Sequence, residues 1–249
     1  MALIICVDGL GGHPETTFAD LARFLEVNRH HVTFADIEGI RTHEDRIQSV
    51  IQAFRNGQSM LDEMNEDDRR IILIGHSAGG SAVRVAAARL RDEASLSGVV
   101  LLSQAMPRFT WYMTEALAKA MFWRSIDLLF ARDIDMTSEE YTSLIQPAVS
   151  AKLRKSVDAR QTIPGPEART LAFWAPRLER YDKPTLVIYG ERDQWISTNA
   201  HRKLCFKIAR KCTSHLESNE IPGAGHIILA SDSSVQVIEM IKRWINNLA

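Results

Sequence analysis

Short apolar runs alternate along the chain with longer segments in which apolar residues recur every three or four positions. Several of the short runs are apolar at every position, which is typical of strands that helices cover on both faces in a parallel sheet. The apolar runs predict six strands, at residues 2–7, 31–37, 70–75, 98–103, 184–190 and, from a weaker signal, 215–222.

The longer segments predict five helices, at residues 14–27, 42–64, 77–91, 198–210 and 233–248. In the last of them the apolar residues share one helix face, at steps of three and four: Ile238, Ile241, Ile245 and Leu248. Alternating strands and helices require right-handed crossovers. The pattern therefore predicts an α/β fold with a doubly wound, mostly parallel sheet.

Residues 108–175 interrupt this alternation. They contain amphipathic runs and the helix-breaking sequence IPGPEA, but no segment with a clear strand pattern. We expect a helical insertion that forms a cap or lid, between two parts of one core at residues 1–107 and 176–249. The insertion holds nine of the 18 aromatic residues in 68 of 249 positions, more than an even share. These side chains can pack the insertion onto the sheet or line a partly aromatic substrate pocket, and both interpretations stay open.

Composition narrows the classes of function. A chain of 249 residues with 45% apolar content can bury the core of one α/β domain. Its 30 Lys and Arg residues nearly balance 31 Asp and Glu residues, so nothing favours nucleic acid or an anionic membrane as partner, and we expect a small-molecule substrate. Three cysteines without a CxxC pair, no signal sequence and no apolar run of about 20 residues predict a cytoplasmic protein without a membrane span. The oligomeric state does not follow from the sequence.

The sequence IILIGHSAGG indicates the chemistry. Here a predicted strand runs directly into a predicted helix through the pattern G-x-S-x-G, with Gly75 and Gly79 on either side of Ser77. Such a turn holds the serine in a strained, exposed conformation, and small residues two positions away let the turn close. The backbone N–H of Ala78 then lies at a helix N-terminus, where developing negative charge is favoured. Ser77 is the candidate nucleophile, although a Gly-Ser-Gly stretch can also be an ordinary loop.

A serine nucleophile needs a base, and the chain has eight histidines. His226 follows the last predicted strand in the glycine-rich sequence IPGAGHIILASD, from which it can reach Ser77. His76 adjoins Ser77 on the turn, where its side chain should diverge from the hydroxyl. The other six lie in loops or at the edges of helices and strands, where a solvated role is expected: His13, His30, His31, His43, His201 and His215.

The base in turn needs a carboxylate that fixes its tautomer. Asp193 lies in the sequence GERDQW after the strand 184–190, at the same carboxyl edge of the sheet as Ser77. Glu191 is the alternative, but it lies closer to the strand and is expected to form a surface pair. The order along the chain is then Ser77, Asp193 and His226.

This order, with the motifs GHSAGG, GERD and PGAGH at these separations, resembles the α/β-hydrolase family over nearly the whole chain. The resemblance implies a serine hydrolase in which Ser77 is the nucleophile, His226 is the general base and then the general acid, and Asp193 orients the histidine. It implies no cofactor and no metal ion. Residues 108–175 resemble the variable helical cap of the family.

The resemblance also implies an oxyanion hole. One donor in the family is the N–H after the nucleophile, and the other comes from a loop with the pattern His-Gly-x-Gly after an early strand. By correspondence the donors here are Ala78 and Leu10, the latter in the sequence VDGLGGHPETTF. Asp8 stands where the histidine is usual, so its carboxylate must point away, be paired or be neutralised. The chain begins almost at this strand, so we expect about six strands, without the two leading strands that are common in the family.

These observations favour a hydrolase that cleaves an ester-like bond of a small, partly apolar substrate through an acyl-enzyme on Ser77. The same residues could serve a thioesterase, an acyltransferase, a hydrolase of carbon–carbon bonds, a lyase or a cofactor-free halogenating enzyme. A receptor that binds a ligand without catalysis is the alternative outside enzymes. A basic stretch could attract an anionic substrate or an acyl carrier, although a solvated helix face is the favoured interpretation: Lys152, Arg154, Lys155 and Arg160.

Overall fold

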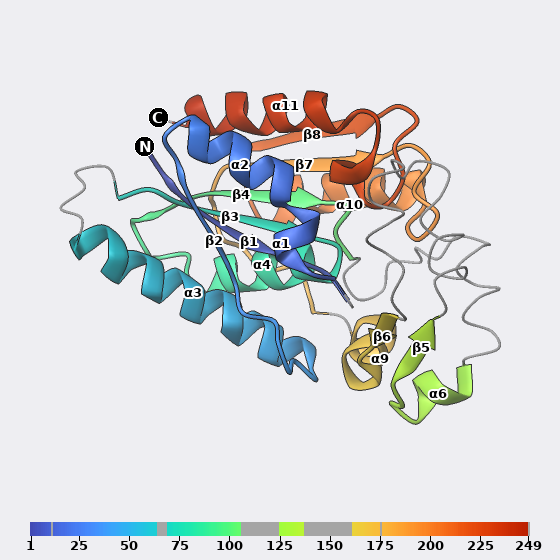
Figure 1. Cartoon of the computed structure of the whole chain (residues 1–249). Coiled ribbons are helices and arrows are strands. Elements are labelled where there is room, and N and C mark those ends of the chain that lie inside the picture. Colours follow the sequence, from blue (N-terminus) through green and yellow to red (C-terminus); the bar gives the residue numbers. More distant parts are fainter. Residues whose placement is uncertain (11, 64–68, 106–124, 137–160, 175, 249) are drawn as a thin grey trace.

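The computed structural model describes residues 1–10, 12–63, 69–105, 125–136, 161–174 and 176–248. In this part of the chain, six parallel strands form the central sheet, in the order β2-β1-β3-β4-β7-β8 (Figure 1). The predicted number and direction of these strands are confirmed. The strands are β1 (Leu3–Val7), β2 (His31–Phe34), β3 (Ile71–His76), β4 (Leu96–Leu102), β7 (Thr185–Gly190) and β8 (Leu216–Ile221).

Helices cover both faces of this sheet. One face carries α3 (His43–Glu63), α4 (Ala78–Arg89) and α10 (Thr198–Lys211), and the other carries α2 (Ala19–Val27) and α11 (Ser234–Asn246) (Figure 1). The layers are therefore helix, sheet and helix, which confirms the predicted fold class.

The core consists of two apolar layers, one on each side of the sheet. Successive side chains of a strand point to opposite faces. In β1, Leu3, Ile5 and Val7 pack in one layer, and Ile4 and Cys6 pack in the other. All five side chains are fully buried. An uninterrupted apolar run is therefore what a strand between two helical layers requires.

The single helix predicted at residues 14–27 is wrong, because two helices occupy this segment. α1 (Pro14–Thr17) ends at Phe18, whose backbone lies at φ −103° and ψ 5°, and α2 begins at the next residue. Phe18 is fully buried in the same layer as α2. α1 is only four residues long and has the sequence PETT, so the spacing of apolar residues gives no sign of a separate helix before Phe18. The other predicted helices agree with the structure to within two residues at each end.

The described part of the insertion, residues 125–136 and 161–174, contains strands as well as helices. β5 (Ile134–Met136) pairs antiparallel with β6 (Gln161–Ile163), beside α6 (Ser125–Leu129) and α9 (Gly165–Trp174) (Figure 1). The expectation that this insertion has no strand is therefore wrong. Strands of three residues are too short to show an alternating pattern, and a long stretch of chain separates the two partners.

Two features of the sequence analysis lie outside the described residues. These are six of the nine aromatic residues of the insertion and the basic stretch at residues 152–160. Of the three other aromatic residues, Phe130 is 65% exposed. Its side chain therefore lies on the surface.

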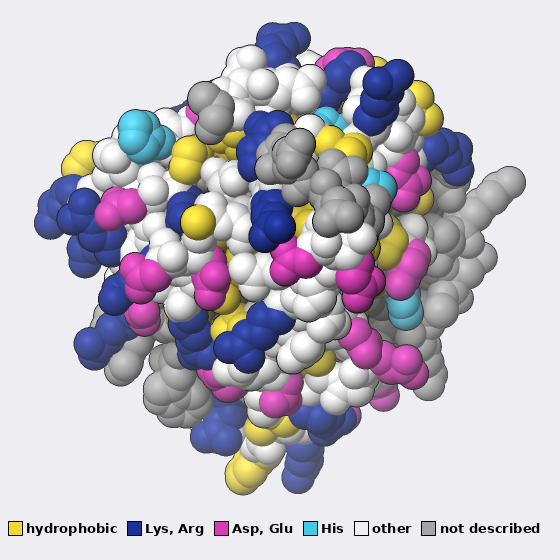
Figure 2. Space-filling view, turned by 90° about the vertical axis from the view of Figure 1, so that its left-hand side faces the viewer, with side chains coloured by type: hydrophobic (Ala, Val, Ile, Leu, Met, Phe, Trp, Pro, Cys, Tyr) yellow, Lys and Arg dark blue, Asp and Glu magenta, His cyan; other side chains and the backbone are white. Residues whose placement is uncertain are grey.

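The amino ends of the strands lie at the same end of the molecule as the two ends of the described chain (Figure 1). Figure 2 shows this end, where basic and acidic side chains are interspersed with scattered apolar ones. The mixture is consistent with a formal net charge of −1. None of the described helices is both long enough and apolar enough to cross a membrane.

Candidate active site

The candidate residues lie at the point where the order of successive strands in the sheet reverses. β1 lies between β2 and β3, so the connection after β1 leads to one side and the connection after β3 leads to the other. In open α/β sheets, such a switch point forms a crevice at the carboxyl ends of the strands. The loop with Gly9 follows β1 and Ser77 follows β3, so both border this crevice.

Ser77 occupies a strained turn between β3 and α4. Its backbone lies at φ 53° and ψ −119°, a conformation that costs a non-glycine residue about 1 to 3 kcal/mol. The turn also needs a residue without a side chain at Gly79, because a Cβ there would lie 2.3 Å from the carbonyl oxygen of Val7. Residue 77 is partly exposed, whereas residues 71–76 and 78–88 are buried. The turn therefore presents the serine hydroxyl to the crevice.

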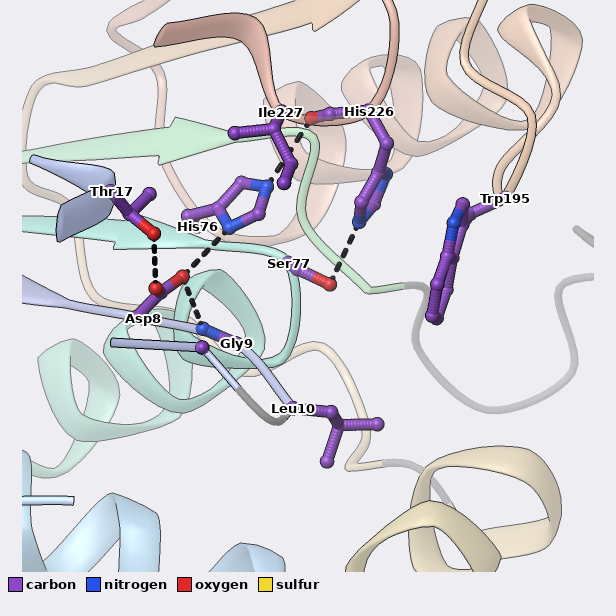
Figure 3. A pocket seen from close by; sticks show the side chains of 10 residues that line it. Asp8, Gly9, Leu10, Thr17, His76, Ser77, Trp195, His226 and Ile227 are labelled. Atoms are coloured by element: carbon purple, nitrogen blue, oxygen red, sulfur yellow. Dashed lines mark hydrogen bonds and ion pairs between the residues drawn. The ribbon is translucent and has the colours of Figure 1, made fainter. Parts of the chain in front are cut away.

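Three side chains form a hydrogen-bonded chain that ends at Ser77. Nε2 of His226 lies 3.0 Å from Oγ of Ser77 (Figure 3). On the other side of the ring, Nδ1 of His226 lies 2.8 Å from Oδ2 of Asp193. Since a carboxylate only accepts, Nδ1 carries the hydrogen and Nε2 presents a lone pair to the hydroxyl. The structure thus brings together the three residues that the sequence analysis selected, from loops after β3, β7 and β8.

Glu191, the alternative carboxylate, has no part in this chain. It is exposed, and its Oε2 accepts the backbone N–H of Gly223 at 2.8 Å. Asp193, two residues further from β7, is the carboxylate that reaches His226.

Burial sets the electrostatics of Asp193 and His226, which are 5% and 4% exposed. Burial would raise the pKa of the Asp193 carboxyl, but the charge of His226 and the hydrogen bonds from His201 and His226 hold that pKa well below its ordinary value. Burial lowers the pKa of His226, and the opposing effect of Asp193 does not cancel this decrease. At neutral pH the pair is a carboxylate and a neutral imidazole, which is the state that can take a proton from Ser77.

The turn after β7 restrains both members of this pair. Oδ1 of Asp193 accepts the backbone N–H groups of Trp195 and Ile196 at 2.8 and 2.9 Å. The indole of Trp195 stacks on the imidazole of His226, with ring centres 5.3 Å apart and planes at 13° (Figure 3). The same short turn therefore orients the carboxylate and limits the tilt of the imidazole.

Asp8, the departure from the usual oxyanion loop, is 1% exposed and paired. Its Oδ1 accepts the N–H of Gly9 at 2.7 Å and lies 2.9 Å from Nδ1 of His76, while its Oδ2 accepts the hydroxyl of Thr17 (Figure 3). Burial would raise the pKa of Asp8, but the hydrogen bond and charge of His76, with the bonds from Thr17 and Gly9, hold that pKa below its ordinary value. The carboxylate is thus fully engaged by its own surroundings.

His76 connects the Asp8 loop to the His226 loop. Its Nε2 lies 3.2 Å from the backbone oxygen of His226, and the two imidazole centres are 5.1 Å apart. The ring turns away from the Ser77 hydroxyl, as the sequence analysis expected (Figure 3).

A buried ion pair that the sequence analysis missed ties the insertion to the Asp8 loop. Glu167 of α9 accepts from Nε and Nη2 of Arg46 at 2.7 and 2.9 Å. Nη1 of Arg46 donates to the backbone oxygen of Asp8 at 2.7 Å. Burial would raise the pKa of Glu167, but Arg46 and His43 hold it below its ordinary value. A signal was present in the sequence, because His43 and Arg46 share the apolar face of α3 with Ile47, and a buried charge needs a partner.

The expectation of a solvated role is wrong for three histidines. His30, His43 and His201 are 8%, 1% and 0% exposed. His43 lies 3.2 Å from Glu167, and His201 lies 3.2 Å from Asp193. Both histidines lie near the start of a helix, but the spacing of buried residues places both on the face that packs against the core.

A cavity of about 30 Å³ lies among these groups, with room for one or two water molecules. Leu10 lines this cavity together with Ser77 and His226. Ala78 is the first residue of α4, so its N–H is among the donors that have no partner within the helix. Among the described residues, no group of three or more His, Cys, Asp or Glu side chains is arranged to hold a metal ion.

Comparisons with known proteins define the family and the fold of the chain. A model of the alpha/beta hydrolase family matches residues 4–240. The chain therefore belongs to the alpha/beta hydrolase family. A comparison with curated protein sequences finds no match.

Several solved structures share the fold at low sequence identity. A soluble variant of monoglyceride lipase from Saccharomyces cerevisiae has a TM-score of 0.77 at 15% identity, over 100% of this chain and 87% of that one. The monoacylglycerol lipase of Paleococcus ferrophilus has a TM-score of 0.67 at 19% identity, over 99% of this chain and 95% of that one. Polyneuridine aldehyde esterase has a TM-score of 0.68 at 14% identity, over 98% of this chain and 99% of that one.

Proposed function

We propose that the chain is a serine hydrolase that cleaves an ester-like bond of a small, partly apolar substrate through an acyl-enzyme on Ser77. The hydrogen-bonded chain from Asp193 through His226 to Ser77 carries this proposal. The positive φ of Ser77 and membership of the alpha/beta hydrolase family support it.

In the acylation step, Oγ of Ser77 attacks the carbonyl carbon while its proton passes to Nε2 of His226. The imidazolium then gives this proton to the leaving oxygen as the carbon–oxygen bond breaks, and an alcohol departs. In the second step, His226 takes a proton from a water molecule whose oxygen attacks the acyl carbon. The proton returns to Oγ as the acid leaves, and Asp193 stabilises the transient imidazolium throughout.

We assign the oxyanion to the backbone N–H groups of Ala78 and Leu10. The position of Ala78 at the start of α4 and of Leu10 beside the cavity supports this assignment. Asp8 is compatible with an anion at this site, because its carboxylate is already bound by His76 and by the N–H of Gly9.

We also assign residues 108–175 to the cap of the site. The insertion leaves the carboxyl end of β4, which is the edge that carries Ser77, and returns before β7. Its helix α9 is fixed to the core through Glu167 and Arg46, whose guanidinium also holds the Asp8 loop.

A carboxylic ester is the first substrate class to test. Two of the similar structures are named as lipases of acylglycerols and one as an esterase. Those names describe those proteins, and for this chain they favour an ester among the bonds that a serine nucleophile can cleave.

The test compares Ser77→Ala with Ser81→Ala, a control in the first turn of α4 whose side chain is buried. We expect the natural protein to hydrolyse short-chain p-nitrophenyl esters and to be labelled by a fluorophosphonate probe. Ser77→Ala should lose labelling and about 10⁶-fold in kcat, whereas Ser81→Ala should retain both.

Undiminished labelling of Ser77→Ala would show that another residue is the nucleophile. Product formed only when an alcohol or amine acceptor is added would identify an acyltransferase instead of a hydrolase. Tight binding of an ester without any product would favour a receptor.

A further inference from the structure

Asp193 accepts a second imidazole besides that of His226. Nε2 of His201, on α10, lies 3.2 Å from the same Oδ2 atom that His226 contacts at 2.8 Å. The other oxygen accepts the backbone N–H groups of Trp195 and Ile196. Four N–H donors therefore surround one carboxylate, and the reaction proposed above leaves His201 without a role.

His201 is firmly held in the core. Its side chain is 0% exposed, and its ring stacks on Tyr189 of β7, with centres 4.7 Å apart and planes at 11°. Because Asp193 only accepts, Nε2 carries the hydrogen. Nδ1 has no hydrogen-bond partner among the described residues, and a buried N–H without an acceptor is unfavourable. The tautomer with its hydrogen on Nε2 therefore fits the contacts of the ring.

We propose that His201 is a positioning residue, which fixes the Asp193 carboxylate through its Nε2–H group and thereby moderates the base strength of His226. The inference rests on the proposed function, because the base strength of His226 matters for catalysis only if Ser77 is the nucleophile. His201 acts through Asp193 and does not contact Ser77.

Two effects follow from the shared oxygen. The stacked ring of His201 holds Oδ2 in place while His226 passes a proton between Ser77 and the leaving group. The N–H of His201 also draws on the lone-pair density that would otherwise stabilise the imidazolium of His226. With His201 present, Asp193 stabilises the imidazolium of His226 less strongly, so His226 stays neutral to a lower pH.

Other titratable groups lie near the two histidines. His76 faces His226 from the end of β3, and the Asp8 carboxylate lies behind His76. Tyr189 of β7 faces His201 from the side opposite to α10. A substitution at residue 201 leaves the contacts of His76 and Asp8 in place, so it changes the surroundings of Asp193 selectively.

Three variants separate donation from packing. Glutamine places its amide nitrogen near the position of Nε2 in histidine, whereas asparagine is too short to reach Oδ2 and leucine has no donor. His201→Gln therefore retains the hydrogen bond, and His201→Asn and His201→Leu remove it. Cys205→Ala is the matched control for packing, because Cys205 lies one turn further along the buried face of α10.

The readouts are the pH profile of kcat/KM for a p-nitrophenyl ester and an NMR titration of the His226 ring. In His201→Asn and His201→Leu, we expect both midpoints to rise by about 0.5 to 1 pH unit, because Asp193 then stabilises the imidazolium more strongly. The plateau value of kcat should fall by about 3- to 10-fold with little change in KM. His201→Gln and Cys205→Ala should keep the midpoints of the natural protein.

Unchanged midpoints in the variants without a donor would overturn the inference, as would an equal shift in Cys205→Ala or in His201→Gln. If His201→Leu does not fold, the comparison of His201→Asn with His201→Gln decides the question. The NMR titration requires no catalytic activity, so it tests the effect of His201 on His226 even in an inactive protein. Absence of fluorophosphonate labelling in the natural protein would refute the proposed function separately.

Discussion

Two Asp–His pairs lie side by side at the carboxyl edge of the sheet, but only one of them ends at a serine. In each pair a buried carboxylate oxygen meets Nδ1 of the histidine, at 2.8 Å for Asp193 and His226 and at 2.9 Å for Asp8 and His76. The two rings lie 5.1 Å apart (Figure 3). Residue type, burial and distance therefore do not distinguish the pair that we propose as catalytic from the other pair.

The partner of the second ring nitrogen makes the difference. Nε2 of His226 faces the hydroxyl of Ser77, which can donate, whereas Nε2 of His76 faces the backbone oxygen of His226, which can only accept. Both nitrogens of His76 thus face oxygen atoms of the protein itself, and neither faces the Ser77 hydroxyl. We infer that the first pair acts as a base and that the second pair, with Asp8, holds two loops together.

Among substitutions within the two pairs, the largest expected effect comes from Asp193→Asn. The amide group of asparagine can donate to Nδ1 of His226, which would move the ring hydrogen to Nε2 and remove the acceptor for Ser77. We expect kcat to fall by about 10⁴-fold with little change in KM. Measurements of ester turnover would check this result, with circular dichroism to verify the fold. A folded variant with kcat near that of the natural protein would place the orienting carboxylate elsewhere.

Asp8→Asn tests the Asp8–His76 pair. Loss of the charge leaves buried His76 without its ion-pair partner, so we expect the free energy of unfolding in urea to fall by about 3 to 5 kcal/mol. The loop that carries Leu10 would also lose its anchor, and kcat should fall by about 10- to 100-fold. A loss of 10⁴-fold in a variant of nearly natural stability would mean that Asp8 acts in the chemistry, and the contrast between the pairs would fail.

The meeting of Asp193 and His226, the pair that we propose as catalytic, could be predicted from the sequence because the fold places both residues. Ser77, Asp193 and His226 each follow a readable strand, and parallel strands bring their carboxyl ends to one edge. The structural pair could not be predicted, because nothing in the spacing of Asp8 and His76 shows that the two side chains meet. From the sequence, Asp8 stands out only because it replaces the histidine of the His-Gly-x-Gly pattern.

Side chains on helices were harder to place than the strands. The inner strands β1, β3, β4 and β7 are visible because each is a largely apolar run, whereas the edge strand β8 is more polar and gives a weaker signal. The three-residue strands β5 and β6 carry no such signal. The positions of Arg46, Glu167 and His201 depend on which helix face turns inward and on what meets it there. Helical spacing shows which face of a helix turns inward, but it does not show which residues that face contacts. The contacts with Asp8 and Asp193 could therefore not be predicted.

As the pH falls, we expect the activity to be lost before the protein unfolds. Burial lowers the pKa of His226 from an ordinary value of 6.5, so kcat/KM should have its acidic midpoint below pH 6.5. The folded state then binds this proton less readily than the unfolded state, and stability begins to decrease as the pH falls below about 6.5. The carboxyls of Asp8 and Asp193 have pKa values below the ordinary 3.8. Their contribution is present above that pH and is lost as the pH falls through the lowered values.

Profiles of kcat/KM and of urea midpoints over the same pH range would check this order. We expect activity to disappear while most of the stability remains. Simultaneous loss of both near pH 6 would indicate that protonation of His226 breaks the fold, and that the two pairs are not independent.

Thr17→Val is expected to have the smallest effect and sharpens the comparison most finely. The Thr17 hydroxyl donates to Oδ2 of Asp8, which retains His76 and the N–H of Gly9 when this donor is removed. Loss of one hydrogen bond to a charged acceptor should lower the free energy of unfolding by about 1.5 to 3 kcal/mol. Thr16→Val, at the exposed neighbouring position, is the control. We expect kcat to remain within about twofold, because Asp8 keeps its contacts with His76 and the N–H of Gly9 and still holds the loop that carries Leu10. If kcat fell as far as in Asp8→Asn, the exact placement of the carboxylate would matter to the reaction, and the second pair could not be described as structural alone.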